Sequence, residues 1–335
     1  MNERRDTPTV GVTAGNAFDL SVERDVFDGM DVRFRPVDVE STDDLVAELA
    51  DVDAVIDRLL AAPYTTEVID ALTECRIIAR CGIGVDALDT DRAAERGMYV
   101  VNVPVYCQNE VSEHTLLLIL ALQRNLSAYD SAMRDGVWAQ DVTTPTVHRL
   151  DGQRLGLVGF GTIARLVAEK AQAFGMDVVA ADPYVDAAAM DEAGVEKRSF
   201  EAVLDDADVI SLHAPLVEET RGTMDAAAFE RMNDSAYLVN VARGGLVVEE
   251  ELVTALREGE IAGAGLDVFA EEPASQGDSF PPFESRLREL DNVVLTPHVA
   301  WFSQEANDER RRTAARDVRR VLEGTVPENP VNDPQ

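Results

Sequence analysis

The chain has 335 residues, of which 46% are hydrophobic, and its formal net charge is −33 at pH 7. The hydrophobic content excludes an acidic disordered chain, and the length is sufficient for two domains with substantial cores. The negative charge argues against nucleic acid and anionic membranes as partners, because both are bound through lysine and arginine. No apolar run is long enough to span a bilayer and residues 1–9 lack a signal-peptide pattern, so we expect a cytoplasmic protein.

The first block of the chain alternates between expected strands and helices. Ser41 is a capping residue ahead of a helical pattern that includes Leu45 and Leu49. Short apolar segments bounded by polar residues predict strands at 9–13, 32–37, 54–56, 77–80 and 98–101. This alternation predicts parallel pairing in a doubly wound α/β layer that ends near Pro104.

A long apolar pattern over residues 109–126 predicts one buried helix. Residues 129–150 show no strong period and are expected to leave the compact domain. A second α/β series then starts at Leu155, with further strands expected at 177–181, 209–212, 236–240, 263–267 and 293–296. Six strands separated by helical segments are what a dinucleotide-binding domain requires. Residues 306–322 predict a final amphipathic helix, and the tail 327–335 is expected to be mobile.

The segment after Leu155 contains a nucleotide-binding pattern. Residues 159–164 (Gly159, Gly161, Thr162, Ile163 and Ala164 around Phe160) match Gly-x-Gly-x-x-Gly/Ala. The first glycine permits a tight turn, the second lets backbone approach a pyrophosphate, and the small third residue lets the next helix pack closely. The phosphates are expected on free N–H groups at the helix N-terminus. A strand before the pattern and a helix after it make this a strong indication of a dinucleotide site.

Asp182 follows the second strand of this series. A carboxylate there can accept hydrogen bonds from ribose hydroxyls and repels a 2′-phosphate, which favours NAD(H) over NADP(H). The alternative is a turn aspartate that precedes Pro183. We therefore expect NAD(H) as the cofactor, with NADP(H) as the less favoured possibility.

Four histidines are candidates for an acid or base: His114, His148, His213 and His298. His114 falls in the buried helix and is interpreted as structural, and His148 has no evident role. His213 follows a strand and could border the cofactor site. His298 follows the last strand, at the carboxyl edge of the sheet, where open α/β sheets bind ligands. Because imidazole titrates near neutrality, His298 is the best candidate for proton transfer.

Two charged residues follow other strands of the same series. Glu272 would orient the His298 ring and favour its protonated form. Arg243 would pair with a substrate carboxylate through its planar fork and polarise a keto oxygen. A proton shuttle, an anion clamp and a dinucleotide site together predict hydride transfer to a 2-keto acid. No cysteine or histidine spacing is typical of a metal site, and Cys81 is interpreted as a packed thiol.

These motifs resemble the D-isomer-specific 2-hydroxyacid dehydrogenase family. The resemblance extends over most of the chain and rests on residues 80–86 (RCGIGVD), the nucleotide turn, 213–215, 240–245, 267–273 and 296–298. It implies a catalytic triad of Arg243, Glu272 and His298, with Asp267 beside the nicotinamide. The wider cofactor site is expected to include His213, Pro215, Thr220, Val241 and Ala242.

The resemblance also implies a substrate pocket. The backbone of Ile83 and Gly84 would help hold the substrate carboxylate. Residues 242–247 and 296–301 are most similar to the carboxyl-terminal binding protein branch, which implies that Arg80 and Trp301 line the pocket. For Trp301, ordinary packing at a domain junction is the alternative.

The implied domain map has a Rossmann NAD-binding domain (105–300) inserted into a flavodoxin-like substrate domain (1–104 and 301–335). Family members are usually homodimers, with residues 129–150 as the expected arm. We expect an NAD-dependent D-2-hydroxyacid dehydrogenase that acts as a 2-keto acid reductase on a small 2-keto or 2-hydroxy acid. The alternatives are an NADH-sensing, corepressor-like interaction protein and a phosphoglycerate- or hydroxypyruvate-specific dehydrogenase.

The charge composition predicts a requirement for salt. The chain has only two lysines, Lys170 and Lys197, among its 30 basic residues. Acid-rich, lysine-poor surfaces resemble those of proteins from organisms with molar salt in the cytoplasm. At about 1 M salt the Debye length is roughly 3 Å, which screens the repulsion between like charges.

Overall fold

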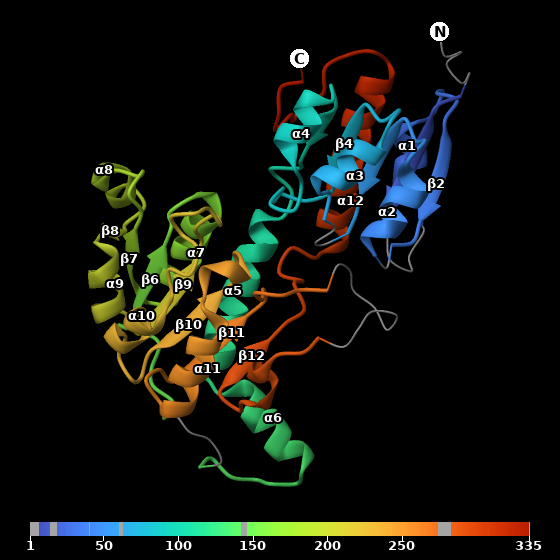
Figure 1. The fold of residues 1–335 in the computed structure, drawn as a ribbon. Helices are drawn as coiled ribbons and strands as arrows, with labels where there is room; N and C mark the ends of the chain where they lie inside the picture. The colour runs from blue at the N-terminus through green and yellow to red at the C-terminus, as the bar shows by residue number, and fades with distance from the viewer. Residues whose placement is uncertain are drawn as a thin grey trace. The chain divides into compact units, whose positions relative to one another are not determined.

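The computed structural model describes residues 7–13, 19–39, 41–59, 63–141, 146–273 and 283–334. The chain divides into two compact units (Figure 1). Unit 1 comprises Met1–Tyr106, Pro273–Phe283 and Ser303–Gln335, and unit 2 comprises Cys107–Glu272 and Glu284–Phe302. Each unit contains a parallel β-sheet with helices packed against it, so the fold is α/β with two parallel-sheet domains, as predicted.

The unit 1 sheet has the strand order β2-β1-β3-β4-β5, with every pair parallel. This is the flavodoxin-like order. Its strands match the expected segments to within one residue: β1 Thr9–Thr13, β2 Arg33–Val37, β3 Ala54–Asp57, β4 Ile77–Arg80 and β5 Tyr99–Val101. Its helices are α1 Ser21–Val26, α2 Thr42–Leu49, α3 Thr66–Ala71, α4 Thr90–Glu95 and α12 Gln304–Leu322.

Two hydrophobic clusters lie on the two faces of this sheet, because alternate strand residues point to opposite sides. Val55 and Ile78 belong to the cluster with α2, α3 and α4. Ala54 and Ile77 belong to the cluster with α1 and α12. The predicted cap is confirmed: Ser41 Oγ accepts from the Asp44 N–H, and the Asp44 carboxylate accepts from the Ser41 N–H.

The unit 2 sheet has the order β12-β11-β10-β9-β6-β7-β8, again with every pair parallel. Its strands are β6 Arg154–Val158, β7 Asp177–Ala181, β8 Glu196–Lys197, β9 Val209–Leu212, β10 Tyr237–Asn240, β11 Gly263–Leu266 and β12 Val293–Leu295. The six expected strands are confirmed, and β8 is a seventh, two-residue strand at the sheet edge. The order is that of a dinucleotide-binding fold, with its topological switch point between β6 and β9.

Helices cover both faces of this sheet. Helices α5 and α7 pack against each other, and α5 also contacts β10, β11 and β12; α9, α10 and α11 form a second, contiguous group. The helices are α5 Gln108–Gln123, α6 Leu126–Arg134, α7 Thr162–Ala173, α8 Ala187–Asp191, α9 Phe200–Asp206, α10 Ala226–Arg231 and α11 Glu249–Glu258. No helix in the described ranges is both long and apolar enough to cross a membrane.

The helix predicted over residues 109–126 is confirmed over most of its length, but it ends three residues earlier than expected. Helix α5 ends at Gln123, Asn125 has a left-handed backbone with φ +48°, and α6 begins at Leu126. Asparagine tolerates this conformation better than most residues, so it permits a sharp break between two helices. The expected irregular stretch 129–150 is therefore helical at its start, whereas residues 142–145 lie outside the described ranges. No residue of α6 is buried.

Residues 327–335 were expected to be mobile, but residues 328–332 make hydrogen bonds to other parts of unit 1. Glu328 N and Asn329 Nδ2 donate to the buried carboxylate of Asp317. Asn332 Oδ1 accepts from Val100 N, and Pro330 forms an antiparallel bridge with Val101. The tail residues thus form hydrogen bonds with the edge strand β5, a contact that composition alone does not reveal.

Candidate active site

The nucleotide turn joins β6 to α7 at the topological switch point. Gly159 has φ +90°, and a Cβ atom there would lie 2.8 Å from Ala214 N in the loop after β9. Gly161 is the N-cap of α7 and has open space where a Cβ would be. Because no side chain caps this helix, the first N–H groups of Thr162 and Ile163 are available to an anion. Ala164 is fully buried, as a small third residue should be.

Asp182 holds this turn from the end of β7. Its Oδ2 accepts from Phe160 N at 2.8 Å, and its Oδ1 accepts from Tyr184 N at 2.8 Å. A carboxylate has about four acceptor sites, so both contacts leave capacity for ribose hydroxyls. The turn and cofactor interpretations of Asp182 are therefore compatible. Sequence reasoning missed Arg165, whose guanidinium stacks over the Phe160 ring at 4.5 Å.

Other expected cofactor residues lie on loops at the same edge of the sheet. Thr220 Oγ1 donates to Pro215 O at 2.6 Å and accepts from Val217 N, which closes the loop after β9. Val241 and Ala242 follow β10, where Ala242 N donates to Asn240 Oδ1.

His213 is unsuited to proton donation. Its Nε2 lies 2.9 Å from Ser211 Oγ, and burial lowers the pKa of its imidazole to about 4. A ketone reductase needs an acid that is protonated near neutrality, so His213 is a neutral residue of the loop after β9.

This depressed pKa predicts how stability depends on pH. Between pH 6.5 and about 4 the unfolded chain binds a proton at His213 that the folded chain does not, so acidification through this window destabilises the fold. The slope from this one group is at most about 1.4 kcal/mol per pH unit. Chemical denaturation of the wild type and His213→Gln should show the wild type losing more stability between pH 7 and 5. Parallel curves for the two proteins would contradict the assignment.

The Arg243 loop is fixed by two polar contacts and one close backbone approach. The buried side chain of Asn240 accepts from Ala242 N at 3.0 Å and donates to Arg243 O at 2.9 Å. A Cβ on Gly244 would lie 1.8 Å from Phe269 O, so only glycine fits. The loop that carries Arg243 therefore lies directly against the segment that leads to Glu272. Sequence reasoning missed Asn240, although its position at a strand end was a signal.

His298 and Glu272 form the central pair of the site. His298 Nδ1 lies 2.6 Å from Glu272 Oε2, and Glu272 Oε1 accepts from Phe269 N at 2.9 Å. The side chains are 27% and 15% exposed, so the pair is sheltered yet reachable. With Nδ1 paired to the carboxylate, proton exchange with a substrate falls to Nε2. The Arg243, Glu272 and His298 loops follow the adjacent strands β10, β11 and β12.

Asp267 lies at the end of β11 and is fully buried. Its carboxylate accepts from Thr296 Oγ1 and from the backbone N–H groups of Val299 and Ala300. Trp301 Nε1 donates to His298 O at 2.9 Å, a hydrogen bond within unit 2, and its place in a substrate pocket stays a prediction. No group of three or more potential ligands in the described ranges could hold a metal ion.

The remaining expected substrate residues belong to unit 1. Arg80 Nη1 pairs with the buried Asp57 carboxylate at 2.7 Å, and it also donates to Leu59 O. Ile83 O accepts from Asn102 Nδ2 at 2.7 Å, which fixes the loop that includes Gly84. These printed contacts lie within unit 1, and the part of Arg80, Ile83 and Gly84 in binding substrate stays a prediction.

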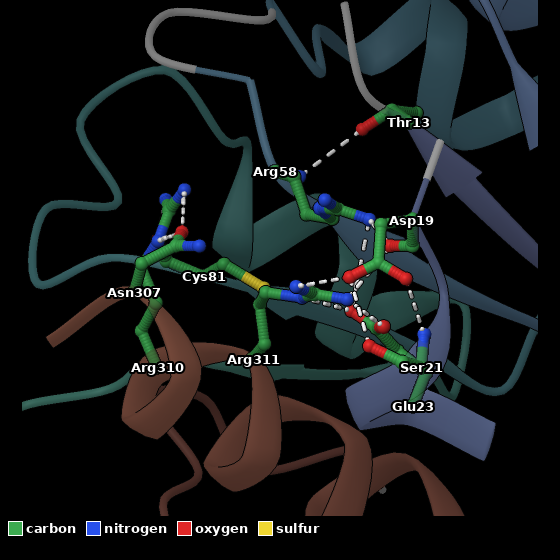
Figure 2. Close-up of polar contacts among 9 residues, drawn as sticks. All are labelled: Thr13, Asp19, Ser21, Glu23, Arg58, Cys81, Asn307, Arg310 and Arg311. Atoms are coloured by element: carbon green, nitrogen blue, oxygen red, sulfur yellow. Dashed lines mark hydrogen bonds and ion pairs between the residues drawn. The ribbon is translucent and has the colours of Figure 1, made fainter. Parts of the chain in front are cut away.

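Figure 2 shows an arginine cluster in unit 1 that sequence reasoning missed. Arg311 of α12 makes a bidentate pair with the buried Glu23 at 2.6 and 2.9 Å. Arg58 lies 3.7 Å from the same carboxylate, and Arg310 donates to Cys81 O at 2.8 Å. Burial lowers the pKa of the Arg58 and Arg310 guanidinium groups. We call Arg58, Arg310 and Arg311 the arginine cluster.

The strand order of unit 2 and its glycine turn define a dinucleotide-binding domain, and the charged loops at its carboxyl edge form a candidate acid–base site. Residues 116–300 match the family "D-isomer specific 2-hydroxyacid dehydrogenase, NAD binding domain". The chain belongs to this family, and NAD(H) is the cofactor that its binding domain takes.

Among similar proteins, D-3-phosphoglycerate dehydrogenase of Mycobacterium leprae is 38% identical over 91% of this chain and 56% of its own length. The chain thus spans little more than half of that relative. A solved structure of the TT0316 protein from Thermus thermophilus is 31% identical, with a TM-score of 0.82, and the match covers 96% of this chain and 99% of that one. D-lactate dehydrogenase from Aquifex aeolicus, solved with NAD and lactic acid, is 26% identical, with a TM-score of 0.85, over 97% and 100% of the chains.

Proposed function

We propose that this protein is an NAD(H)-dependent D-2-hydroxyacid dehydrogenase that works as a 2-keto acid reductase. The observation that carries the proposal is the 2.6 Å contact between His298 Nδ1 and Glu272 Oε2. This pair lies at the carboxyl edge of a sheet whose first loop is a dinucleotide-binding turn, in a chain of a dehydrogenase family. Membership of that family supports the same reaction class.

The residues present fit a dinucleotide. The open space at Gly161, the uncapped N-terminus of α7 and the spare acceptor sites of Asp182 suit a pyrophosphate and a ribose diol. When bound as NADH, the cofactor supplies a hydride for a carbonyl carbon. The Asp182 carboxylate disfavours the 2′-phosphate of NADP(H). The Arg165 guanidinium, which lies over the Phe160 ring of the nucleotide turn, places a positive charge beside the same turn. We propose NAD(H) as the preferred cofactor and NADP(H) as the weaker one.

The protein side chains supply the proton and the charge. Protonated His298 would donate from Nε2 to the substrate oxygen, while Glu272 holds Nδ1 and offsets the imidazolium charge. The Arg243 guanidinium would pair with the substrate carboxylate and draw electron density from the keto oxygen. In the direction of oxidation, His298 would take the hydroxyl proton back.

We propose that the specific 2-keto acid substrate carries a second anionic group, as 3-phosphohydroxypyruvate does. The names of the D-3-phosphoglycerate dehydrogenase relatives support this choice. The expected likeness to the carboxyl-terminal binding protein branch finds no support among these relatives. An intact His298–Glu272 pair also argues against a purely NADH-sensing protein.

The function is tested by a panel of 2-keto acids in molar salt, with NADH or NADPH oxidation followed by absorbance. The panel should contain pyruvate, glyoxylate, hydroxypyruvate and 3-phosphohydroxypyruvate. We expect turnover with NADH, faster than with NADPH and fastest on the doubly anionic substrate. Binding of NADH without turnover of any 2-keto acid would overturn the reductase and favour the sensor.

Three further properties are proposed. Unit 1, with residues 80–84, would be the substrate-binding domain. The protein would be cytoplasmic and a homodimer, with α6 and the segment after it as the arm. Leu126, Met133 and Trp138 are 56%, 52% and 88% exposed, which is consistent with a surface that a partner covers.

We predict that the protein requires salt. At a net charge of −33, lowering the ionic strength from molar to about 0.05 M lengthens the Debye length roughly fivefold and restores repulsion. Thermal unfolding in KCl should therefore show a marked fall in Tm on dilution. Sucrose added at low salt is the control for nonspecific stabilisation. Equal Tm values in molar and dilute KCl would contradict the prediction.

A further inference from the structure

The backbone of His298 is in a conformation that needs support. Its φ is +52°, in the left-handed region that few non-glycine residues adopt. Such a residue costs of order 1–3 kcal/mol and persists only where surrounding contacts enforce it. The position of the catalytic imidazole therefore depends on whatever holds residues 296–300.

Asp267 supplies most of that support. Its backbone oxygen accepts from His298 N at 2.8 Å. Its Oδ1 accepts from Val299 N at 2.9 Å, and its Oδ2 accepts from Ala300 N at 2.8 Å. This carboxylate thus fixes the two residues that follow His298, and its own orientation decides where the histidine lies.

The orientation of Asp267 depends in turn on a chain of donors. Thr296 Oγ1 donates to Asp267 Oδ1 at 2.6 Å, and that bond uses the only hydroxyl proton. His114 Nε2 lies 2.9 Å from the same Thr296 oxygen, which can then only accept. His114 Nε2 must therefore carry a proton and donate it. The same nitrogen lies 3.6 Å from Asp267 Oδ1.

We propose that His114 is a positioning residue for the catalytic His298, acting through Thr296 and Asp267. The inference rests on the proposed function. It assigns a role to His114 of α5, which lies 182 positions before Thr296 in the chain. Helix α5 packs against β10, β11 and β12 of the unit 2 sheet. Because α5 is largely buried, it holds His114 in place at the start of this series of hydrogen bonds. A substituted side chain that also presents an N–H to Thr296 Oγ1 should therefore preserve the series.

Kinetics test the donor requirement with matched variants. Glutamine places an amide N–H near the position of histidine Nε2, whereas leucine has none. We expect His114→Leu to lower kcat about 10- to 100-fold, with the KM for NADH nearly unchanged, because misplacement of a catalytic group has costs of this size. His114→Gln should stay within about threefold of the wild type. Equal losses in the two variants would overturn the proposal.

Thr296 gives an independent arm of the same experiment. Thr296→Val removes the hydroxyl at constant shape, and Thr296→Ser keeps it. We expect the valine variant to lose kcat as His114→Leu does, and the serine variant to retain it. Since both changes break one chain, the double variant His114→Leu/Thr296→Val should be no worse than the poorer single variant. Additive losses would show that the two residues act separately.

A spectroscopic readout needs no activity. The chain has two tryptophans, and Trp301 Nε1 donates to His298 O, whereas Trp138 is 88% exposed. In ¹H–¹⁵N spectra, His114→Leu should shift the Trp301 indole signal and leave the Trp138 signal in place. His114→Gln should shift neither. An unmoved Trp301 signal in His114→Leu would overturn the proposal.

The two levels of failure are distinguishable. If His298 variants retain turnover, the proposed function is wrong, whatever His114 does. If His298 is required but His114→Leu matches the wild type in kcat and in the Trp301 signal, only the positioning role is wrong.

Discussion

Replacement of His298 by asparagine is expected to lower kcat for 2-keto acid reduction by about 10²- to 10⁴-fold, the usual contribution of a general acid. Asparagine tolerates the φ of +52° at this position, so the change removes the proton donor without forcing the backbone to rearrange. The loss should appear in kcat, measured by NADH oxidation at saturating substrate. Binding of NADH, followed by fluorescence, should remain.

The control for this experiment is His148→Asn. His148 is exposed and makes no contact with the catalytic loops among the described hydrogen bonds. It should retain wild-type kcat. Turnover of His298→Asn at near the wild-type rate would exclude the proton-transfer role, and with it the proposed mechanism.

Arg243→Ala is expected to lower kcat/KM for 2-keto acids by about 100-fold or more. A hydrogen bond to a charged group contributes about 1.5–3 kcal/mol, and a bidentate pair makes two of them. Lysine should restore little, because a point charge does not reproduce the planar fork. Initial-rate kinetics over a range of substrate concentrations measures the effect.

Chemical rescue separates a lost guanidinium from a damaged loop. Added guanidinium ion should recover part of the Arg243→Ala activity, whereas it should not help His298→Asn. Arg149→Ala, at an exposed position, is the matched control and should behave as the wild type. An Arg243→Ala enzyme with unchanged kcat/KM on carboxylate substrates would contradict the anion clamp.

Local signals allowed much of the fold to be predicted. Strand β1 and the Ser41 cap of α2 are encoded within a few neighbouring residues, and both were predicted correctly. The break at Asn125 was missed, because the apolar pattern of α5 continues to Leu126 while the turn depends on one backbone angle. Strand β8 was missed because two residues at a sheet edge have no periodicity.

The candidate site was predicted in its parts but not in its connections. The motifs indicated His298 and Glu272, which the structure places 2.6 Å apart. They did not indicate that His114 reaches Thr296, or that Arg311 pairs with Glu23 across 288 positions. Such contacts join residues whose separation in the chain carries no pattern, so only the fold reveals them.

Helix α12 has a consequence for the order of events during synthesis. Its Ala314, Ala315, Val318 and Val321 complete the hydrophobic cluster on one face of the unit 1 sheet, although the strands of that sheet are made first. All the strands of unit 2 have left the ribosome before α12 does. While the strands of unit 2 are being made, the nascent residues 1–106 therefore have a sheet face on which the apolar residues of α12 are still missing. Hydrophobic surface that is exposed in this way during folding promotes aggregation.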